Sequence, residues 1–145
     1  IGFMPVVKRF FGYHGAEHKT SNAYEAGAEL TPEVVAKYPI EHPRCGTAFM
    51  LTFVLLSILI HSLLGDMTFV WRLASRILLI PVIAGIAVEF IRWTANHLDS
   101  ALVRLLIKPN LALQSLTTRQ PDNSMLEVAI ESFKTMRQAE QEVVV

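Results

Sequence analysis

Two histidines and a glutamate stand close together near the start of the chain, in the run His14-Gly15-Ala16-Glu17-His18. On a helix, His14 and His18 lie one turn apart on the same face, so both imidazoles can bind one metal ion. The order H-x-x-E-H is that of inverted zinc peptidases, and neutral imidazole nitrogens suit zinc. The pattern predicts a metal site in which Glu17 is a general base toward water, or a further ligand.

A second cluster precedes the first long apolar segment. His42 and Cys45 lie three residues apart, a common separation for two metal ligands at a turn. Arg44 would favour the thiolate form of Cys45. Two clusters in one short segment indicate convergence on one divalent metal, with zinc as the expected ion.

Plainer interpretations stay open for both clusters. Gly15 weakens a helix, so the histidines beside it would only decorate an exposed surface. Arg44 would be an interfacial anchor and Cys45 a small buried residue.

Two glutamates are further candidates for the site. Glu25 lies between the two clusters and is either a ligand or an ordinary solvated carboxylate. Glu89 lies inside the second apolar segment, where it would be a ligand or the partner of a ligating histidine. The alternative for Glu89 is an ion pair with Arg92 or Arg44.

The composition indicates what kind of protein positions these side chains. Of 145 residues, 52% are hydrophobic and 18% charged, with mean hydropathy +0.38, which is more apolar than an ordinary soluble domain. Thirteen basic and 13 acidic side chains cancel, so no nucleic-acid partner is expected. A single cysteine excludes an internal disulfide framework.

Two apolar segments have the length of membrane spans. Residues 46–64 contain His61, expected to be structural, as their only ionisable side chain, and a helix of this length spans roughly 28 Å. Residues 73–93 follow after the turn signal Gly65-Asp66. A buried soluble helix is the alternative, but the pairing of the segments favours a two-span hairpin over residues 46–93.

A short connection places residues 1–45 and 94–145 on the same side of the membrane. Five basic residues precede the first span and five follow Trp93, so the positive-inside rule predicts both ends in the cytoplasm. The lipid bilayer is therefore the expected partner, with the metal site at its cytoplasmic face. Residues 1–45 form an extramembrane segment with the metal site, and residues 94–145 an extramembrane helical segment.

The remaining elements are also predicted as helices. A short helix over residues 30–38 has Thr31 as N-cap, and an apolar helix over 101–107 is broken by Lys108-Pro109-Asn110. A last helix starts near Ser124 in a capping box with Glu127, and its apolar stripe needs a surface to pack on. The fold class is therefore all-α, a membrane helical hairpin with short extramembrane helices before and after it.

Three motifs occur in one order along the chain. They are Tyr13-His14-Gly15-Ala16-Glu17-His18-Lys19-Thr20, then His42-Pro43-Arg44-Cys45-Gly46-Thr47, then a block from Pro109 through Leu113-Gln114-Ser115-Leu116-Thr117-Thr118-Arg119 to Pro121-Asp122. Together they resemble the YqhQ-like family of bacterial membrane proteins, which are described as predicted metal-dependent enzymes.

The resemblance implies which residues form the site. The positions that match the polar pattern of the family are His14, Glu17, His18, His42, Cys45, Glu89, Gln114, Thr117, Thr118 and Arg119. Two features depart from the family. Asn110 stands where glycine is common, and a further N-terminal region of the family is missing. The opening residues 1–7 also read like the end of a hydrophobic element, so we expect an incomplete chain.

The expected function is metal-dependent hydrolysis at the cytoplasmic membrane face. His14, His18 and one or both of His42 and Cys45 would bind zinc, with Glu17 as base. The candidates for substrate binding are Arg44, Gln114, Thr117, Thr118 and Arg119. One alternative is a closed metal site that only stabilises a structural or assembly protein. Another is a homo-oligomeric transporter in which Glu89 and the Pro81/Gly85 break mark an ion path.

Overall fold

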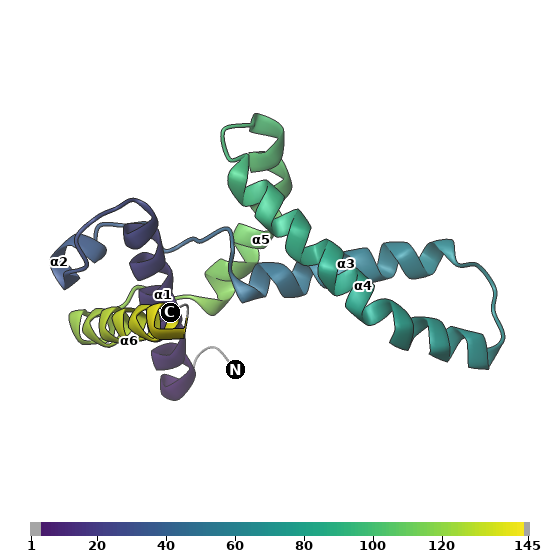
Figure 1. Cartoon of the computed structure of the whole chain (residues 1–145), viewed down its shortest axis with the longest axis horizontal. Helices are drawn as coiled ribbons and strands as arrows, with labels where there is room; N and C mark the ends of the chain where they lie inside the picture. Colours follow the sequence, from purple (N-terminus) through teal and green to yellow (C-terminus); the bar gives the residue numbers. More distant parts are fainter. Residues whose placement is uncertain (1–3, 144–145) are drawn as a thin grey trace. The chain divides into compact units, whose positions relative to one another are not determined.

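The computed structural model describes residues 4–143, and within this range the chain is entirely helical and contains no strand. The helices are α1 Pro5–Glu25, α2 Pro32–Val35, α3 Gly46–Leu63, α4 Phe69–Asn96, α5 Ala101–Thr117 and α6 Asn123–Val143 (Figure 1). The all-α fold class is confirmed. The sequence of residues 1–7 resembles the end of a hydrophobic element. Residues 1–3 lie outside the described range, and residues 5–7 begin helix α1.

The chain forms two compact units. The terminal unit comprises the residues up to His42 and those from Gln114 onward, and so contains α1, α2 and α6. The hairpin unit, Pro43–Leu113, contains α3, α4 and most of α5.

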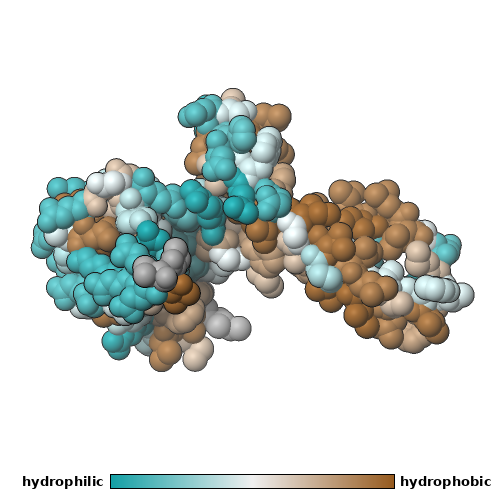
Figure 2. Space-filling model, viewed as in Figure 1, coloured by the Kyte–Doolittle hydropathy of each residue, from teal (hydrophilic) through white to brown (hydrophobic). Residues whose placement is uncertain are grey.

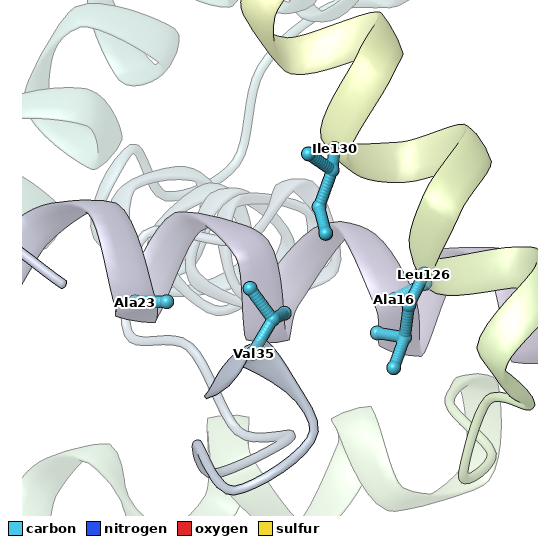
Figure 3. Packing of buried hydrophobic residues seen from close by; sticks show 5 residues of the cluster. All are labelled: Ala16, Ala23, Val35, Leu126 and Ile130. Atoms are coloured by element: carbon cyan, nitrogen blue, oxygen red, sulfur yellow. The ribbon is translucent and has the colours of Figure 1, made fainter. Parts of the chain in front are cut away.

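The terminal unit is built around a small apolar core where α6 crosses α1 (Figures 1 and 3). Ala16 and Ala23 of α1, Val35 of α2, and Leu126 and Ile130 of α6 are buried there. Small alanines on α1 let the two helices approach closely. Helix α1 therefore provides the surface against which the apolar stripe of α6 packs.

Gly15 is required by this packing. A Cβ atom at Gly15 would collide with the carbonyl oxygen of Arg119 and lie 2.8 Å from Cδ1 of Ile40. The backbone N–H of Arg119 also donates to the carbonyl of Phe11 at 2.9 Å. The helix runs through Gly15, and the missing side chain makes room for the segments that carry Ile40 and Arg119.

The segment after α2 is fastened to α1 by Lys19. The Lys19 ammonium is buried and donates to the carbonyls of Ala36 at 2.9 Å and Tyr38 at 2.6 Å. The prediction of a helix over residues 30–38 is wrong beyond Val35, because these carbonyls accept from Lys19 and the chain continues in tight turns. Thr31 is the N-cap residue as predicted, although its side chain makes no capping bond.

The hairpin unit contains the two predicted spans. Helices α3 and α4 pack against each other and are joined by residues 64–68, where Gly65 has φ +67°. Both are long and apolar enough to cross a membrane, and α4 starts four residues before the predicted span. Only 11% and 17% of their most apolar windows are buried, so hydrophobic side chains cover much of the surface of the hairpin (Figure 2).

The predicted helix break at residues 108–110 is wrong. Helix α5 continues through Pro109 to Thr117, although proline removes one backbone hydrogen bond. Val103 and Ile107 are buried, and the Asn110 amide donates to the hydroxyl of Thr52 at 3.4 Å. These tertiary contacts offset the local preference of the Lys-Pro-Asn sequence.

The start of α6 is capped by Asp122 rather than by the predicted Ser124 and Glu127 box. Oδ1 of Asp122 accepts from the backbone N–H of Met125 at 2.9 Å and from the Ser124 hydroxyl at 2.6 Å. An aspartate at this position satisfies an N–H group that the helix itself leaves without a partner.

Candidate metal centre

Helix α1 places His14 and His18 together, with ring centroids 4.4 Å apart. Nδ1 of His14 lies 2.9 Å from the Thr117 carbonyl oxygen, and Nδ1 of His18 lies 2.7 Å from that of Ile40. A carbonyl oxygen can only accept, so in each neutral ring Nδ1 carries the proton. Nε2 is then the atom able to bind a metal ion, which is how ligating histidines are commonly oriented.

His42 brings a third imidazole to the same unit. Its ring centroid lies 5.8 Å from that of His18, and its Nε2 lies 3.2 Å from Oε1 of Glu25. A neutral His42 donates from Nε2 to this carboxylate, so Nδ1 is the ring nitrogen without a proton. Glu25 thus holds this imidazole in one orientation, as carboxylates beside ligating histidines do.

Gln114 fixes the backbone of His42. The Gln114 side chain accepts from the His42 N–H at 3.0 Å and donates to the His42 carbonyl at 2.7 Å. It is fully buried, so both bonds are shielded from water. This predicted substrate-binding residue supports the histidine cluster.

The polar side chains that follow Gln114 also bind backbone carbonyls. The hydroxyls of Thr117 and Thr118 donate to the Gln114 carbonyl at 3.2 and 2.8 Å. The guanidinium of Arg119 donates to the carbonyls of Ser115 and Thr118, both at 2.8 Å. These side chains, from Gln114 to Arg119, therefore stabilise the backbone at the start of the α5–α6 connection. The carbonyl of Thr117 orients His14.

Cys45 lies three residues beyond His42, at the start of the hairpin unit. It is the N-cap residue of α3, and its buried sulfur lies 3.5 Å from the Thr47 N–H and 3.2 Å from the Thr47 hydroxyl. The chain limits the Cα atoms of His42 and Cys45 to a separation of about 11 Å. The neighbouring Arg44 is exposed.

The predicted base Glu17 lies on another side of α1. Its exposed side chain lines a groove of about 330 Å³ between α1 and α6, together with Tyr13, Thr20, Phe133 and other α6 residues. The contacts described for the histidines involve Glu25 instead. The role of Glu17 as the general base stays a prediction, which mutation of this residue would test.

Glu89 forms the ion pair that was one of its two interpretations. Its carboxylate accepts from Arg92 at 3.0 Å, and both side chains are largely exposed on α4. This pairing accounts for the charge of Glu89 within the hairpin unit.

Sequence reasoning missed the residues that hold the histidines in place. Lys19 and Asn22 of α1 bind the backbone of residues 36–41, and Asn22 donates to the carbonyls of Pro39 and Glu41 at 2.9 Å. The available signal was helical spacing, since Asn22 follows His18 by four positions. Burial lowers the pKa of Lys19, an effect that Glu41 partly opposes.

The donor set suits zinc or a similar divalent ion. Three imidazoles lie in one unit, and each has one ring nitrogen engaged by an oxygen acceptor. That arrangement fixes the tautomer of each ring, and an imidazole nitrogen without a proton is a donor of the type that zinc prefers.

Comparison with known proteins agrees with the resemblance in the motifs. Residues 1–139 match the family described as "Protein of unknown function (DUF1385)". The chain is 38% identical over 140 residues to "Uncharacterized protein YqhQ" of Bacillus subtilis (strain 168). The match covers 97% of the chain and 44% of that relative, so the chain spans less than half of the relative's length. No solved structure matches the chain. By the match over almost its whole length, the chain belongs to the DUF1385 family, which includes proteins like YqhQ.

Proposed function

We propose that this chain is the metal-binding part of an integral membrane enzyme that catalyses hydrolysis with a divalent metal ion, zinc first among the candidates. The observation that carries the proposal is the orientation of three imidazoles by oxygen acceptors within the terminal unit. Nε2 of His14, Nε2 of His18 and Nδ1 of His42 are the proposed ligand atoms. Cys45, tethered three residues from His42, is the proposed fourth ligand.

The residues of the chain have separate tasks in this proposal. A bound zinc ion would supply Lewis acidity and lower the pKa of water. The carbonyls of Thr117 and Ile40 keep a proton on each Nδ1, and Glu25 keeps one on Nε2 of His42. Glu17 is the proposed acceptor of a proton from water, with Glu25 as the second carboxylate to test. Arg44 and Arg119 are proposed to attract an anionic substrate group.

Membrane insertion of α3 and α4 is supported by their exposed apolar side chains. A core helix of a soluble protein buries most of its apolar surface, whereas only 11% and 17% of the two windows are buried here. The packing of α1 against α6 supports placing the segments before α3 and after α4 on one side of the membrane. The positive-inside rule makes that side the cytoplasm.

Metal content of the complete, detergent-purified protein tests the ligand set. We expect about one metal ion per chain in the wild type and loss of binding in His14→Ala and His18→Ala, since two ligands share one ion. The matched control is His97→Ala, which changes an exposed histidine of the hairpin unit. In the cobalt-substituted protein, Cys45→Ser should remove a thiolate charge-transfer band. Metal-free wild-type protein would contradict the whole proposal.

Catalysis needs a separate test, because metal can also be purely structural. Glu17→Gln and Glu25→Gln should retain the metal yet lose hydrolysis of activated ester or phosphodiester substrates if either carboxylate is the base.

A closed structural metal site is the second candidate function. Burial of His18 and His42 favours it, because catalytic sites keep one position open to water. Azide added to the cobalt protein distinguishes the two. A changed absorption spectrum indicates an open position, and an unchanged spectrum together with absent hydrolysis indicates a closed site.

A further inference from the structure

A buried histidine nitrogen lacks a partner near the loop end of the hairpin. Nδ1 of His61 lies 2.7 Å from the Ser57 carbonyl oxygen and therefore carries the proton of the neutral ring. Nε2 is buried and has no hydrogen-bond partner among the described residues. Such a group is costly unless something else binds it.

This imidazole faces a cavity that also contains two arginines. The cavity has a volume of about 190 Å³ and is lined by His61, Leu64, Gly65 and Met67, and by Arg72, Ser75 and Arg76 of α4. The guanidinium of Arg72 is held over the turn by a 3.2 Å bond to the Met67 carbonyl. The cavity is therefore rich in groups that bind anions.

Arg72 and Arg76 place two positive charges near the loop end of the hairpin. They lie one turn apart on α4, and Arg72 ends the first turn, where the helix dipole disfavours cations. Asp66 is the one acidic residue in the sequence between His61 and Arg76. Within residues 4–143 neither arginine forms an ion pair with it. An external anion would balance this charge.

A second cavity adjoins the first and is mainly apolar. It has a volume of about 370 Å³ and shares His61 and Arg76 with the first cavity. Its other walls are side chains of α3 and α4, namely Phe53, Ser57, Ile58, Ile80 and Ile83. A cationic cavity beside an apolar one matches a molecule with a phosphate group and an acyl chain.

We propose that the loop end of the hairpin binds a phospholipid. Its phosphate group pairs with Arg72 and Arg76 beside the imidazole of His61. One acyl chain lies in the apolar cavity between α3 and α4. Free phosphate shares the headgroup chemistry but leaves the apolar cavity unused. All these residues belong to the hairpin unit, so the proposal is independent of the metal site.

Titration of the complete protein in a neutral maltoside detergent tests the proposal. The probes are dihexanoyl phosphatidic acid, dihexanoyl glycerol without the phosphate, and inorganic phosphate. The readout is the ¹⁵N resonance of Nε2 of His61, which shifts when an anion binds beside the ring. His61→Gln identifies the resonance.

We expect saturable binding of the phosphatidic acid, and in Arg76→Gln an affinity at least about tenfold weaker, as for loss of one charge-assisted bond. Arg92→Gln is the matched control, because it removes an exposed arginine near the opposite end of the same helix and should change the affinity less than about twofold. Circular dichroism establishes that each variant remains folded.

Each other outcome overturns part or all of the proposal. Equal binding of inorganic phosphate would show an anion site that does not select lipid. Equal binding of dihexanoyl glycerol would show an apolar cleft without phosphate recognition. An unmoved His61 resonance, or equal affinity in Arg76→Gln, would exclude the site altogether.

Discussion

At the scale of single residues, the sequence indicates candidate ligands but not the groups that orient them. His14, His18 and His42 could be selected because imidazole is a rare side chain with one dominant chemistry. The carbonyls that fix two of these rings belong to Ile40 and Thr117, and every residue has a carbonyl group. No sequence pattern marks which carbonyl will face a ring, so the tautomers required the structure.

The contacts of Gln114 with the backbone of His42 were also not predictable from the sequence, and they lead to a testable prediction. Gln114→Leu keeps an apolar volume similar to glutamine but leaves the backbone N–H and carbonyl of His42 without their partner. We expect the free energy of unfolding of the terminal unit to fall by about 1–3 kcal/mol, the cost of unsatisfied buried groups. Metal affinity should fall about 10- to 100-fold, as for loss of a supporting contact. Thr135→Ala, an exposed change on α6, serves as control for both measurements.

Lys19 is a second residue with a measurable role. Lys19→Met should destabilise the terminal unit by about 1–3 kcal/mol, because the carbonyls of Ala36 and Tyr38 lose their donor. Hydrogen exchange of residues 32–41 should accelerate, whereas exchange in α4 should not change. Unaltered exchange around α2 would refute this role.

Because of Lys19, the free energy of unfolding should depend on pH in the alkaline range. Burial lowers the pKa of Lys19 in the folded state, so the unfolded chain binds more protons as pH approaches the ordinary value of 10.5. The stability of the wild type should therefore rise with pH in the range just below 10.5, relative to that of Lys19→Met.

At the scale of elements, long apolar patterns were predictable and local interruptions were not. Helices α3, α4 and α6 follow from runs and stripes of apolar residues. The continuation of α5 through Pro109 depends on Asn110 reaching Thr52, which is 58 positions away in the sequence. A local signal for a break was outweighed by a contact that no local window contains.

The cap of α6 makes an element-scale prediction. Hydrogen bonds from the Ser124 hydroxyl and then from the Met125 N–H lower the pKa of Asp122 below its ordinary 3.8. The cap therefore stabilises α6 above that value and is lost as pH falls through the lowered pKa. Asp122→Ala should fray the first turn of α6 at neutral pH, measured by hydrogen exchange. Asp122→Asn retains an acceptor oxygen, so its α6 should be less sensitive to acid than that of the wild type.

At the scale of the whole molecule, the sequence suggested three consecutive parts, whereas the two outer parts contribute to one compact unit. The apolar stripe of α6 showed that this helix needs a partner. The sequence did not indicate that this partner is α1, because alanines such as Ala16 and Ala23 occur on many helices. The pairing became visible only when the long-range contacts were known.

Membrane topology is the prediction that belongs to this scale. In a Cys45→Ser background, Lys8→Cys and Gln141→Cys should be labelled from the same side of the membrane, because α1 and α6 pack together. Thr68→Cys, in the turn between α3 and α4, should be labelled from the opposite side. A membrane-impermeant maleimide applied to intact cells and to lysed cells measures this. Lys8→Cys and Gln141→Cys on opposite sides would exclude the hairpin.

The pairing of α1 with α6 also has a consequence for biosynthesis. Ala16 and Leu126 belong to one core but are separated by 110 positions in the chain. At about 5–20 residues per second, a ribosome needs about 5–20 s to make the intervening chain. During that time α1 has no α6 to cover its apolar side. A nascent chain would therefore be most vulnerable to proteases and most dependent on chaperones in this interval, and truncation before residue 126 should shorten its lifetime in the cell.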